Sequence, residues 1–425
     1  MGVEHQLAIY FLTLSLISPA LADDIDGVQP AALDQPRINL VVRRQPGGEP
    51  LMGKNADGNA FNVEAFLDTG ASSIDLSPNT AEKLGIQRES IGKTEARFQD
   101  VGVGGGSEFA VSEPIYLSLA PEAPNVNVDQ KDAIAITYSL TTGPFRAEIG
   151  PLTSGSDFLA ALAMGDLDVV GMPAIAGKIV VLDPRDVNAM SEKIRTYVCD
   201  AKTAAADHAP IPKTSLHVKL RFVSFGRFTK ISPPTAQPPA VWANPIIGPN
   251  PFHPDGDRTP PIVLTHHGKA LSGSWLLDTG SAVSMISRKQ AAALGVTYIP
   301  DTDGTDHPRL SGAPADRQFV MTVGGIGGSK KSAGFFLDKL ALPTMEGTPI
   351  VFDHAPVLVA DITVTDSAGR SFTLDGVLGM NFLVASAMVD EGSLVPDIDH
   401  LTAGAFRWIV LNQPAGWLGV ERNPS

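Results

Sequence analysis

Cysteine is almost absent from this sequence. The single cysteine among 425 residues is Cys199, so no disulfide can form within the chain. A protein without disulfides depends on its hydrophobic core, and a chain of this length can supply one. Cys199 itself is expected to be a small buried residue. The length also exceeds that at which one core keeps growing, which favours two domains.

Clusters of basic residues are also missing. The chain has 32 Lys and Arg against 46 Asp and Glu, a formal net charge of -14, and its basic runs never exceed a pair. An acidic protein repels phosphate backbones and anionic lipid surfaces. We therefore expect no nucleic-acid partner and no stable membrane association.

Long apolar segments are lacking, and the clearest short one lies at the start of the chain. Residues 7–17 are mostly apolar, and Ala20-Leu21-Ala22 follows with the small-residue spacing of a cleavage site. The run is too short to span a bilayer convincingly. We expect residues 1–22 to be a signal peptide cleaved near Ala22, leaving a periplasmic or extracellular protein. Because residues 1–6 contain no Lys or Arg, a retained membrane anchor is the alternative.

Signatures of several other chemistries are absent. No Gly-x-Ser-x-Gly elbow of a serine hydrolase occurs. Residues 48–55 approach a phosphate-binding loop, but Asn55 stands where Ser or Thr is required. His266 and His267 are adjacent and would point to opposite faces of a strand, and the other histidines are scattered. We expect no metal and no cofactor.

The sequence repeats itself once. Phe-Leu-Asp-Thr-Gly-Ala at residues 66–71 recurs as Leu-Leu-Asp-Thr-Gly-Ser at residues 276–281. The match extends to Gly-rich segments at 101–106 and 323–328, and to Val169-Val170-Gly171 and Val377-Leu378-Gly379. Each copy has the pattern of a strand, a tight turn, a second strand and a short helix. The 41 Gly and 34 Pro also favour strands and turns over long helices.

This repeat predicts a mainly β protein of two homologous, β-barrel-like lobes with a cleft between them. The strand at residues 216–222 is expected to open the second copy, as residues 37–42 open the first, and residues 231–261 to be a Pro-rich insertion without regular structure. Whether the short acidic segment before residue 37 is a propeptide stays open. The expected boundaries are an N-terminal segment at 23–37, an N-terminal lobe at 38–200, a linker at 201–213 and a C-terminal lobe at 214–425.

The two Asp-Thr-Gly turns carry the candidate chemistry. Asp68 and Asp278, one from each copy, can face each other across the cleft and share a proton, because two close carboxylates do not both ionise easily. One then acts as a general base on water, and the other hydrogen-bonds a carbonyl oxygen. The neighbouring Thr69 and Thr279 can pin the opposing turns, and Gly70 and Gly280 let the backbone approach the carboxylates.

These motifs resemble those of the aspartic proteases of the pepsin and retropepsin clan. The first block is similar to the retropepsin form and the second to the pepsin form, and the two Gly171 and Gly379 elements resemble those that support the catalytic loops. The resemblance implies a pepsin-like fold of two fused units. It also implies a substrate-binding flap that includes Gly104, Gly105 and Gly106, and a second hairpin near residues 317–335. Pepsin-type disulfides and a flap tyrosine are missing, and Phe98 and Phe109 are the nearest aromatic residues.

The sequence thus predicts a monomeric aspartic endopeptidase that hydrolyses peptide bonds with a water activated by Asp68 and Asp278, at acidic pH and without a cofactor. The alternative is a catalytically silent peptide-binding or inhibitory module that uses the same cleft. The distance between the two carboxyl groups discriminates between them, since a shared proton needs hydrogen-bond contact. For the Gly-rich segments, the alternative is a surface turn with no role in substrate binding.

Overall fold

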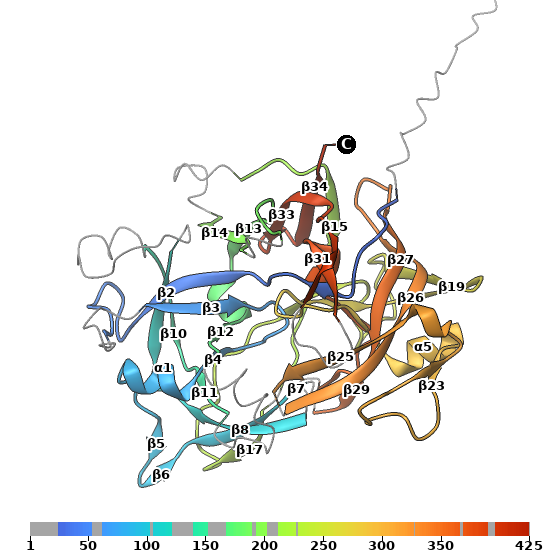
Figure 1. Ribbon diagram of the computed structural model, residues 1–425. Helices are drawn as coiled ribbons and strands as arrows, with labels where there is room; N and C mark the ends of the chain where they lie inside the picture. Colours follow the sequence, from blue (N-terminus) through green and yellow to red (C-terminus); the bar gives the residue numbers. More distant parts are fainter. Residues whose placement is uncertain are drawn as a thin grey trace, which may run out of the picture.

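The computed structural model describes residues 24–52, 62–102, 105–120, 139–151, 167–188, 193–201, 211–226, 228–326, 328–365, 369–389 and 396–424. The protein is mainly β, with 49% of residues in strands and 7% in helices, which confirms that part of the expected fold class. Two ten-stranded sheets and one five-stranded sheet hold most of the strands (Figure 1). The expected barrel-like closure is wrong for the described residues, because neither large sheet closes on itself.

The first ten-stranded sheet comes from the first half of the chain, except for one edge strand. Its β3 alternates buried Val63, Ala65 and Leu67 with more exposed residues, so one face packs into the core. The strand order is β10 (Leu140–Phe145), β9 (Ile115–Leu119), β2 (Arg37–Arg43), β3 (Val63–Leu67), β12 (Val169–Val170), β4 (Ile74–Leu76), β11 (Glu148–Ile149), β8 (Gly105–Val111), β7 (Arg97–Gly102) and β17 (Thr229–Ser232).

The second ten-stranded sheet comes from the second half, drawn in yellow to orange on the right of Figure 1. Its two longest strands, β26 (Gly328–Leu342) and β27 (Ile350–Val359), pair antiparallel. The strand order is β16 (Arg221–Val223), β18 (Asn244–Ile247), β21 (Trp275–Leu277), β30 (Gly376–Leu378), β22 (Met285–Ile286), β27 (Ile350–Val359), β26 (Gly328–Leu342), β19 (Ile262–His266) and β20 (Lys269–Gly273), with β25 (Gln318–Gly325) paired to β26.

The two large sheets repeat one topology. The run β2-β3-β12-β4-β11-β8-β7 matches the run β18-β21-β30-β22-β27-β26-β25, with the same parallel and antiparallel neighbours. The register agrees as well: Phe66 pairs with Arg37, and its counterpart Leu276 pairs with Ile246. The sequence repeat is therefore a structural repeat that extends well beyond the short motifs.

Two expectations about the second copy are wrong. Its opening strand is β18, which lies inside residues 231–261, the segment expected to lack regular structure. The residues expected to open it form β15 (Leu216–Lys219) and β16, of which β15 joins the five-stranded sheet. Pro245 explains why the strand was not expected. A proline in a sequence argues against a paired strand, but β18 accommodates Pro245.

The five-stranded sheet joins the ends of both halves. Figure 1 shows it as green β13 and β14 beside red β33 and β34. Cys199 lies in β14 and is buried, as expected. The strand order is β14 (Arg195–Asp200), β13 (Lys178–Asp183), β33 (Phe406–Asn412), β34 (Trp417–Arg422) and β15.

The segment before residue 37 is part of the fold of the second half. Ile25 donates its N–H to the Val351 carbonyl at 2.8 Å and accepts from the Asp353 N–H at 2.7 Å. Further on, β1 (Ala31–Ala32) pairs with β31 (Ser386–Val389), which pairs with β32 (Pro396–Thr402). These contacts make the segment from residue 25 onward part of the folded second half.

The helices are short, and each of the two main ones follows a repeated turn. Helix α1 (Pro78–Lys83) is capped by Ser77 and α5 (Arg288–Leu294) by Ser287, each through a side-chain oxygen that accepts a backbone N–H. The other short elements are α4 (Met172–Ile175), η1 (Ala315–Arg317), η2 (Met380–Phe382) and the strand pairs β5 (Ser90–Ile91) with β6 (Thr94–Glu95), β23 (Thr297–Tyr298) with β24 (Leu310–Ser311), and β28 (Thr363–Thr365) with β29 (Ser371–Thr373).

Two hairpins, β7–β8 and β25–β26, lie at matching places in the two sheets. They meet near their tips, since a Cβ added at Gly102 would lie 2.7 Å from the Cβ of Ile326. Strand β17, from the second half of the chain, pairs with the outer edge of β7. The aromatic residues of the first hairpin, Phe98 and Phe109, are buried in a cluster against this strand.

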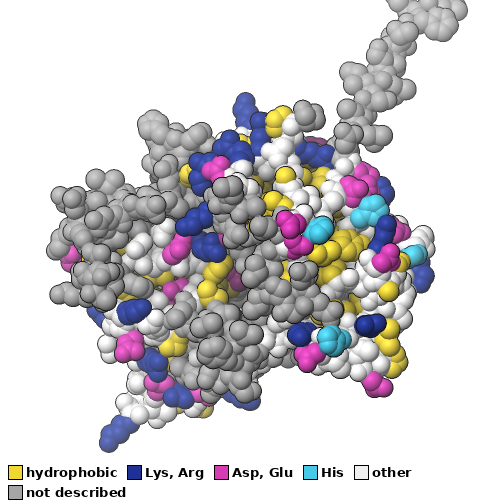
Figure 2. Space-filling view, viewed as in Figure 1, with side chains coloured by type: hydrophobic (Ala, Val, Ile, Leu, Met, Phe, Trp, Pro, Cys, Tyr) yellow, Lys and Arg dark blue, Asp and Glu magenta, His cyan; other side chains and the backbone are white. Residues whose placement is uncertain are grey.

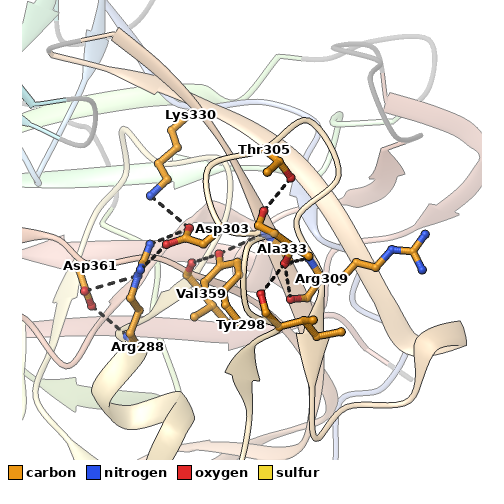
Figure 3. Close-up of polar contacts among 11 residues, drawn as sticks. Arg288, Tyr298, Asp303, Thr305, Arg309, Lys330, Ala333, Val359 and Asp361 are labelled. Atoms are coloured by element: carbon orange, nitrogen blue, oxygen red, sulfur yellow. Dashed lines mark hydrogen bonds and ion pairs between the residues drawn. The ribbon is translucent and has the colours of Figure 1, made fainter.

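Ion pairs anchor the second hairpin to the loop and helix beside it (Figure 3). Asp303 accepts from Arg288 at 2.5 Å and lies 3.6 Å from Lys330 of β26. The Tyr298 hydroxyl donates to the Val359 carbonyl at 2.7 Å and accepts from the Ala333 N–H of β26. The hairpin is therefore held by a charged contact at Lys330, near its tip, and by a backbone contact at Ala333, further toward its base.

Candidate active site

Asp68 and Asp278 occupy equivalent positions just after the end of a strand. The Asp68 N–H donates to the Val170 carbonyl at 3.1 Å, and the Asp278 N–H donates to the Leu378 carbonyl at 3.0 Å. Each aspartate thus continues the pairing of its strand, β3 or β21, for one residue before the chain turns. The parallel neighbours β12 and β30 fix where the two turns begin.

The threonines bind the two turns to each other. The Thr69 hydroxyl donates to the Leu277 carbonyl at 2.7 Å, and the Thr279 hydroxyl donates to the Leu67 carbonyl at 2.5 Å. Each hydroxyl also accepts the backbone N–H of the other threonine, at 3.1 and 3.0 Å. Both side chains are buried, so this reciprocal set of hydrogen bonds fixes the separation of the two aspartates.

The glycines bring each turn against the carboxyl group of the other. A Cβ added at Gly70 would lie 2.5 Å from the Asp278 Cγ, and one added at Gly280 would lie closer still to the Asp68 Cγ. Contacts of this kind exclude any side chain at the two positions. The glycines are therefore a geometric condition for the two carboxyl groups to meet.

The two carboxyl groups hydrogen-bond each other. Asp68 Oδ1 also accepts the N–H groups of Gly70 and Ala71, at 2.7 and 3.0 Å, while Asp278 Oδ1 accepts that of Gly280 at 2.9 Å. Both aspartates keep part of their surface exposed to solvent. Their carboxyl groups are thus held in contact at a place that water can reach.

The surroundings give the two aspartates different acidities. Burial raises the pKa of Asp68, but hydrogen bonds from Asp278 and from nearby backbone N–H groups lower it. Burial raises the pKa of Asp278 well above its usual value, and the Asp68 carboxyl beside it raises that pKa further. Because the two carboxyl groups act on each other, they lose their protons in two separate steps, and over the pH range between those steps the pair holds one proton.

A second pair of glycines lies beneath the turns. A Cβ at Gly171 would lie 2.5 Å from the Ala71 carbonyl oxygen, and one at Gly379 would lie 2.6 Å from that of Val283. The residues that follow them close the contact, since Met172 and Met380 donate their N–H groups to the carbonyls of Ala71 and Ser281 at 3.0 and 2.9 Å. These elements support the two aspartate turns from below.

Two supporting residues were not identified from the sequence. Asn244, fully buried at the start of β18, donates to the carbonyls of Thr69 and Gly70 at 2.9 and 3.0 Å, and accepts from the Ser72 hydroxyl at 2.6 Å. Gln35 donates to the Gly280 carbonyl. By strand register the two residues are equivalent, so each half holds the turn of the other. Recognising β18 as the counterpart of β2 in the second copy would have identified Asn244 as the equivalent of Gln35.

The expected flap residues lie only partly within the described chain. Gly104 is outside the described residues, and Gly105 and Gly106 begin strand β8. Gly105 has a φ of 119°, which a residue with a side chain rarely adopts. A contact between these glycines and a substrate stays a prediction.

The described residues offer few other sites. A cavity of about 510 Å³ lies away from the dyad, on the second half, where Val28, Phe336 and Met388 form its apolar part and His354 and His400 are among its polar residues. On the right of the face drawn in Figure 2, apolar side chains are bordered by acidic and histidine side chains. Within the described chain, no acidic, histidine or cysteine cluster suits a metal ion, and no helix is long and apolar enough to cross a bilayer.

Comparisons with known proteins identify no family for this chain. No family model matches the sequence, and no curated protein matches it. One solved structure with some likeness is conglutin gamma, a basic 7S globulin from lupine seeds, at 9% identity and a TM-score of 0.35, covering 92% of this chain and 96% of that one. A likeness of this size carries no argument about fold or function, so the function rests on the chemistry of the site.

Proposed function

We propose that this protein is an aspartic endopeptidase with a two-lobed, pepsin-like fold, in which Asp68 and Asp278 form the catalytic pair. The observation that carries the proposal is the hydrogen bond between their carboxyl groups, one from each copy of the repeat. The interlocked threonines and the two obligatory glycines support it, because they serve mainly to hold those carboxyl groups together. One chain supplies both aspartates, so the active unit is a monomer.

The chemistry follows from the unequal acidities. The ionised Asp68 takes a proton from a bound water molecule while the oxygen of that water attacks the peptide carbonyl carbon. Asp278 gives its proton to the carbonyl oxygen. The tetrahedral intermediate then collapses as the C–N bond breaks. The leaving nitrogen takes the proton held by Asp68, and Asp278 recovers its own. No cofactor enters this cycle.

A catalytically silent binding module is the rival function. Peptide binding alone needs no contact between two carboxyl groups, and their mutual burial raises the pKa of both. A binding module would gain nothing from this arrangement, whereas a hydrolase needs it. The hydrogen-bond contact therefore favours the enzyme. An export signal at residues 1–22 and a place outside the cytoplasm remain part of the proposal.

The test is cleavage of an unfolded protein by the chain purified from Asp23 onward, between about pH 3 and pH 8, where such a pair titrates. We expect activity on the acidic side and a decline as pH rises through the raised pKa of Asp278, because that group must stay protonated. Asp68→Asn and Asp278→Asn should each lose activity by at least about 1,000-fold, the scale of losing acid–base catalysis. Glu82→Gln, an exposed change on α1, is the matched control.

Two results would contradict the proposed endopeptidase function. Full activity of either asparagine variant would show that the carboxyl pair does not perform the reaction. Absence of cleavage at every pH, with peptide still bound by the folded wild-type protein, would favour the binding module.

A further inference from the structure

The two halves differ at three matched positions beneath their hairpins. Strand register makes Asp75 of β4 equivalent to Met285 of β22, since each lies seven residues after its catalytic aspartate. Asp75 pairs with Glu148 of β11, as Met285 pairs with Leu358 of β27. The first half therefore has carboxylates at two positions where the second half has apolar side chains.

The third position lies on the hairpins themselves. Gly102 pairs with Gly105 at the end of β7, and Gly325 pairs with Gly328 at the end of β25. Asp100 lies two residues before Gly102, and Val323 lies two residues before Gly325, so Asp100 and Val323 are equivalent. The exposure of the matched residues agrees as well. In both halves, the residues at the first two positions are buried and the hairpin residue is partly exposed. The two halves therefore differ in charge at these three positions, while the backbone geometry of the positions is the same.

The second half uses these positions as one apolar surface. Met285 and Leu358 belong to a buried cluster with Phe319 and Met321 of the second hairpin, and Val323 packs against it. Met285 and Leu358 are buried and Val323 is partly exposed, so an apolar side chain would meet this cluster at Val323. The equivalent surface of the first half has the same shape of backbone but carries three acids.

The acids of the first half are not satisfied by their surroundings. Oδ1 of Asp75 and Oε2 of Glu148 are buried and accept no hydrogen bond from any described residue. Asp75 is 8% exposed and Glu148 0%, so both side chains are more than nine-tenths buried. The other carboxylate oxygen of Glu148 accepts from the Ser73 hydroxyl, and Ser73 belongs to the turn that starts at Asp68. The unpartnered oxygens therefore lie close behind the catalytic turn.

The groups that act on these acids are other acids. Burial raises the pKa of Asp75 and of Glu148 well above the usual values, and neighbouring carboxylates raise both further: Asp168 and Asp100 for Asp75, Asp100 and Asp75 for Glu148. Burial raises the pKa of Asp100 to about 6, although a hydrogen bond from the Val101 N–H lowers it. Burial without a positive partner disfavours the ionised forms of these acids, and a cation placed among them favours ionisation and lowers their pKa values.

We infer that Asp75, Glu148 and Asp100 form a subsite for a positively charged substrate side chain, lysine or arginine, on one side of the bond that is cut. The equivalent surface of Met285, Leu358 and Val323 takes an apolar side chain on the other side. This inference rests on the proposed endopeptidase function and adds its substrate class: peptides with a basic and an apolar residue flanking the cleaved bond. Asp100, the partly exposed member, is the point of entry. A bound metal ion is not favoured, because the described acids do not form a metal-binding group.

The test compares peptides that differ only in a lysine or a norleucine at each position beside the cleaved bond. Wild-type protein should cleave the lysine peptide with a kcat/KM about 10- to 100-fold higher at one of the two positions, the size of one hydrogen bond to a charged group. Asp75→Met copies the residue of the second half and should abolish or reverse that preference. Asp100→Asn changes a partly exposed residue and keeps the test valid if Asp75→Met fails to fold. Glu82→Gln is the control with the same loss of charge at an exposed position.

The outcomes separate the two proposals. Cleavage with equal preference for lysine and norleucine, in the wild type and in both variants, overturns the subsite while leaving the endopeptidase intact. If no peptide is cleaved, the endopeptidase fails. Binding of the same peptides to Asp278→Asn then decides the subsite by itself: tighter binding of the lysine peptide supports it, and equal binding overturns it.

Discussion

Asn244 is expected to contribute strongly to stability and to activity, although it is not one of the catalytic pair. Its buried side chain makes three hydrogen bonds, at 2.9, 3.0 and 2.6 Å, to the Thr69 and Gly70 carbonyls and the Ser72 hydroxyl. A net value of about 1 kcal/mol for each bond, with a further cost for carbonyls left buried without a partner, predicts a loss of about 3 to 4 kcal/mol in Asn244→Ala. Gln35→Ala removes the one equivalent bond, to Gly280, and should cost about 1 kcal/mol.

The assay is denaturant unfolding of both variants beside the wild type, with the slope m checked so that the midpoints report stability. Peptide cleavage is measured on the folded fraction. We expect kcat to fall more than KM rises in Asn244→Ala, because the turn that holds Asp68 loses its support. Equal and small losses of stability in both variants, below about 0.5 kcal/mol, would refute the reasoning, since surface substitutions already reach that size.

Two further predictions follow from the site and from the acids behind it. Gly280→Ala should abolish activity in a protein that still folds, because its Cβ would overlap the Asp68 carboxyl group; cleavage at more than about one-tenth of the wild-type rate, near the effect of a single misplaced contact, would contradict this. Glu148→Gln should stabilise the protein at neutral pH and not near pH 4. The folded-state pKa of Glu148 is raised, so its contribution to stability is present below its usual pKa of 4.5 and is lost as pH rises towards the raised value. Thermal unfolding at several pH values checks this, and parallel curves for variant and wild type would show that Glu148 is not titrating as described.

Much of the candidate site could be predicted from the sequence because its determinants are local. An Asp-Thr-Gly turn after an apolar strand carries its carboxylate, its hydroxyl and its small residue within three positions, and its recurrence at 278–280 indicated a pair. The Gly171 and Gly379 elements were recognised for the same reason, since each is a short run with one required glycine. The mainly β character likewise follows from composition and from strands of a few residues between turns.

The limits of the sequence are clearest at β18. Pro245 and the prolines around it made β18 hard to recognise as a strand. Residues 216–222 had a better strand pattern, but β15 pairs with β34 in another sheet, and β16 is only the edge strand beside β18. Strand pattern tells which residues can form a strand, not which strand lies beside it. For that reason the positions of Asn244 and Gln35 against the opposing turns were not predictable before the pairing was known.

The sequence by itself determined the duplicated turn, the identity of the two aspartates and the need for glycine beside them. Only the tertiary structure decided that the two carboxyl groups touch, which residues hold the opposing turns, and that Asp75, Glu148 and Asp100 match Met285, Leu358 and Val323. The physical reason is that these relations depend on the register between strands far apart in the chain. Such register is set by packing and hydrogen bonding across the whole sheet, and no local run of residues encodes it.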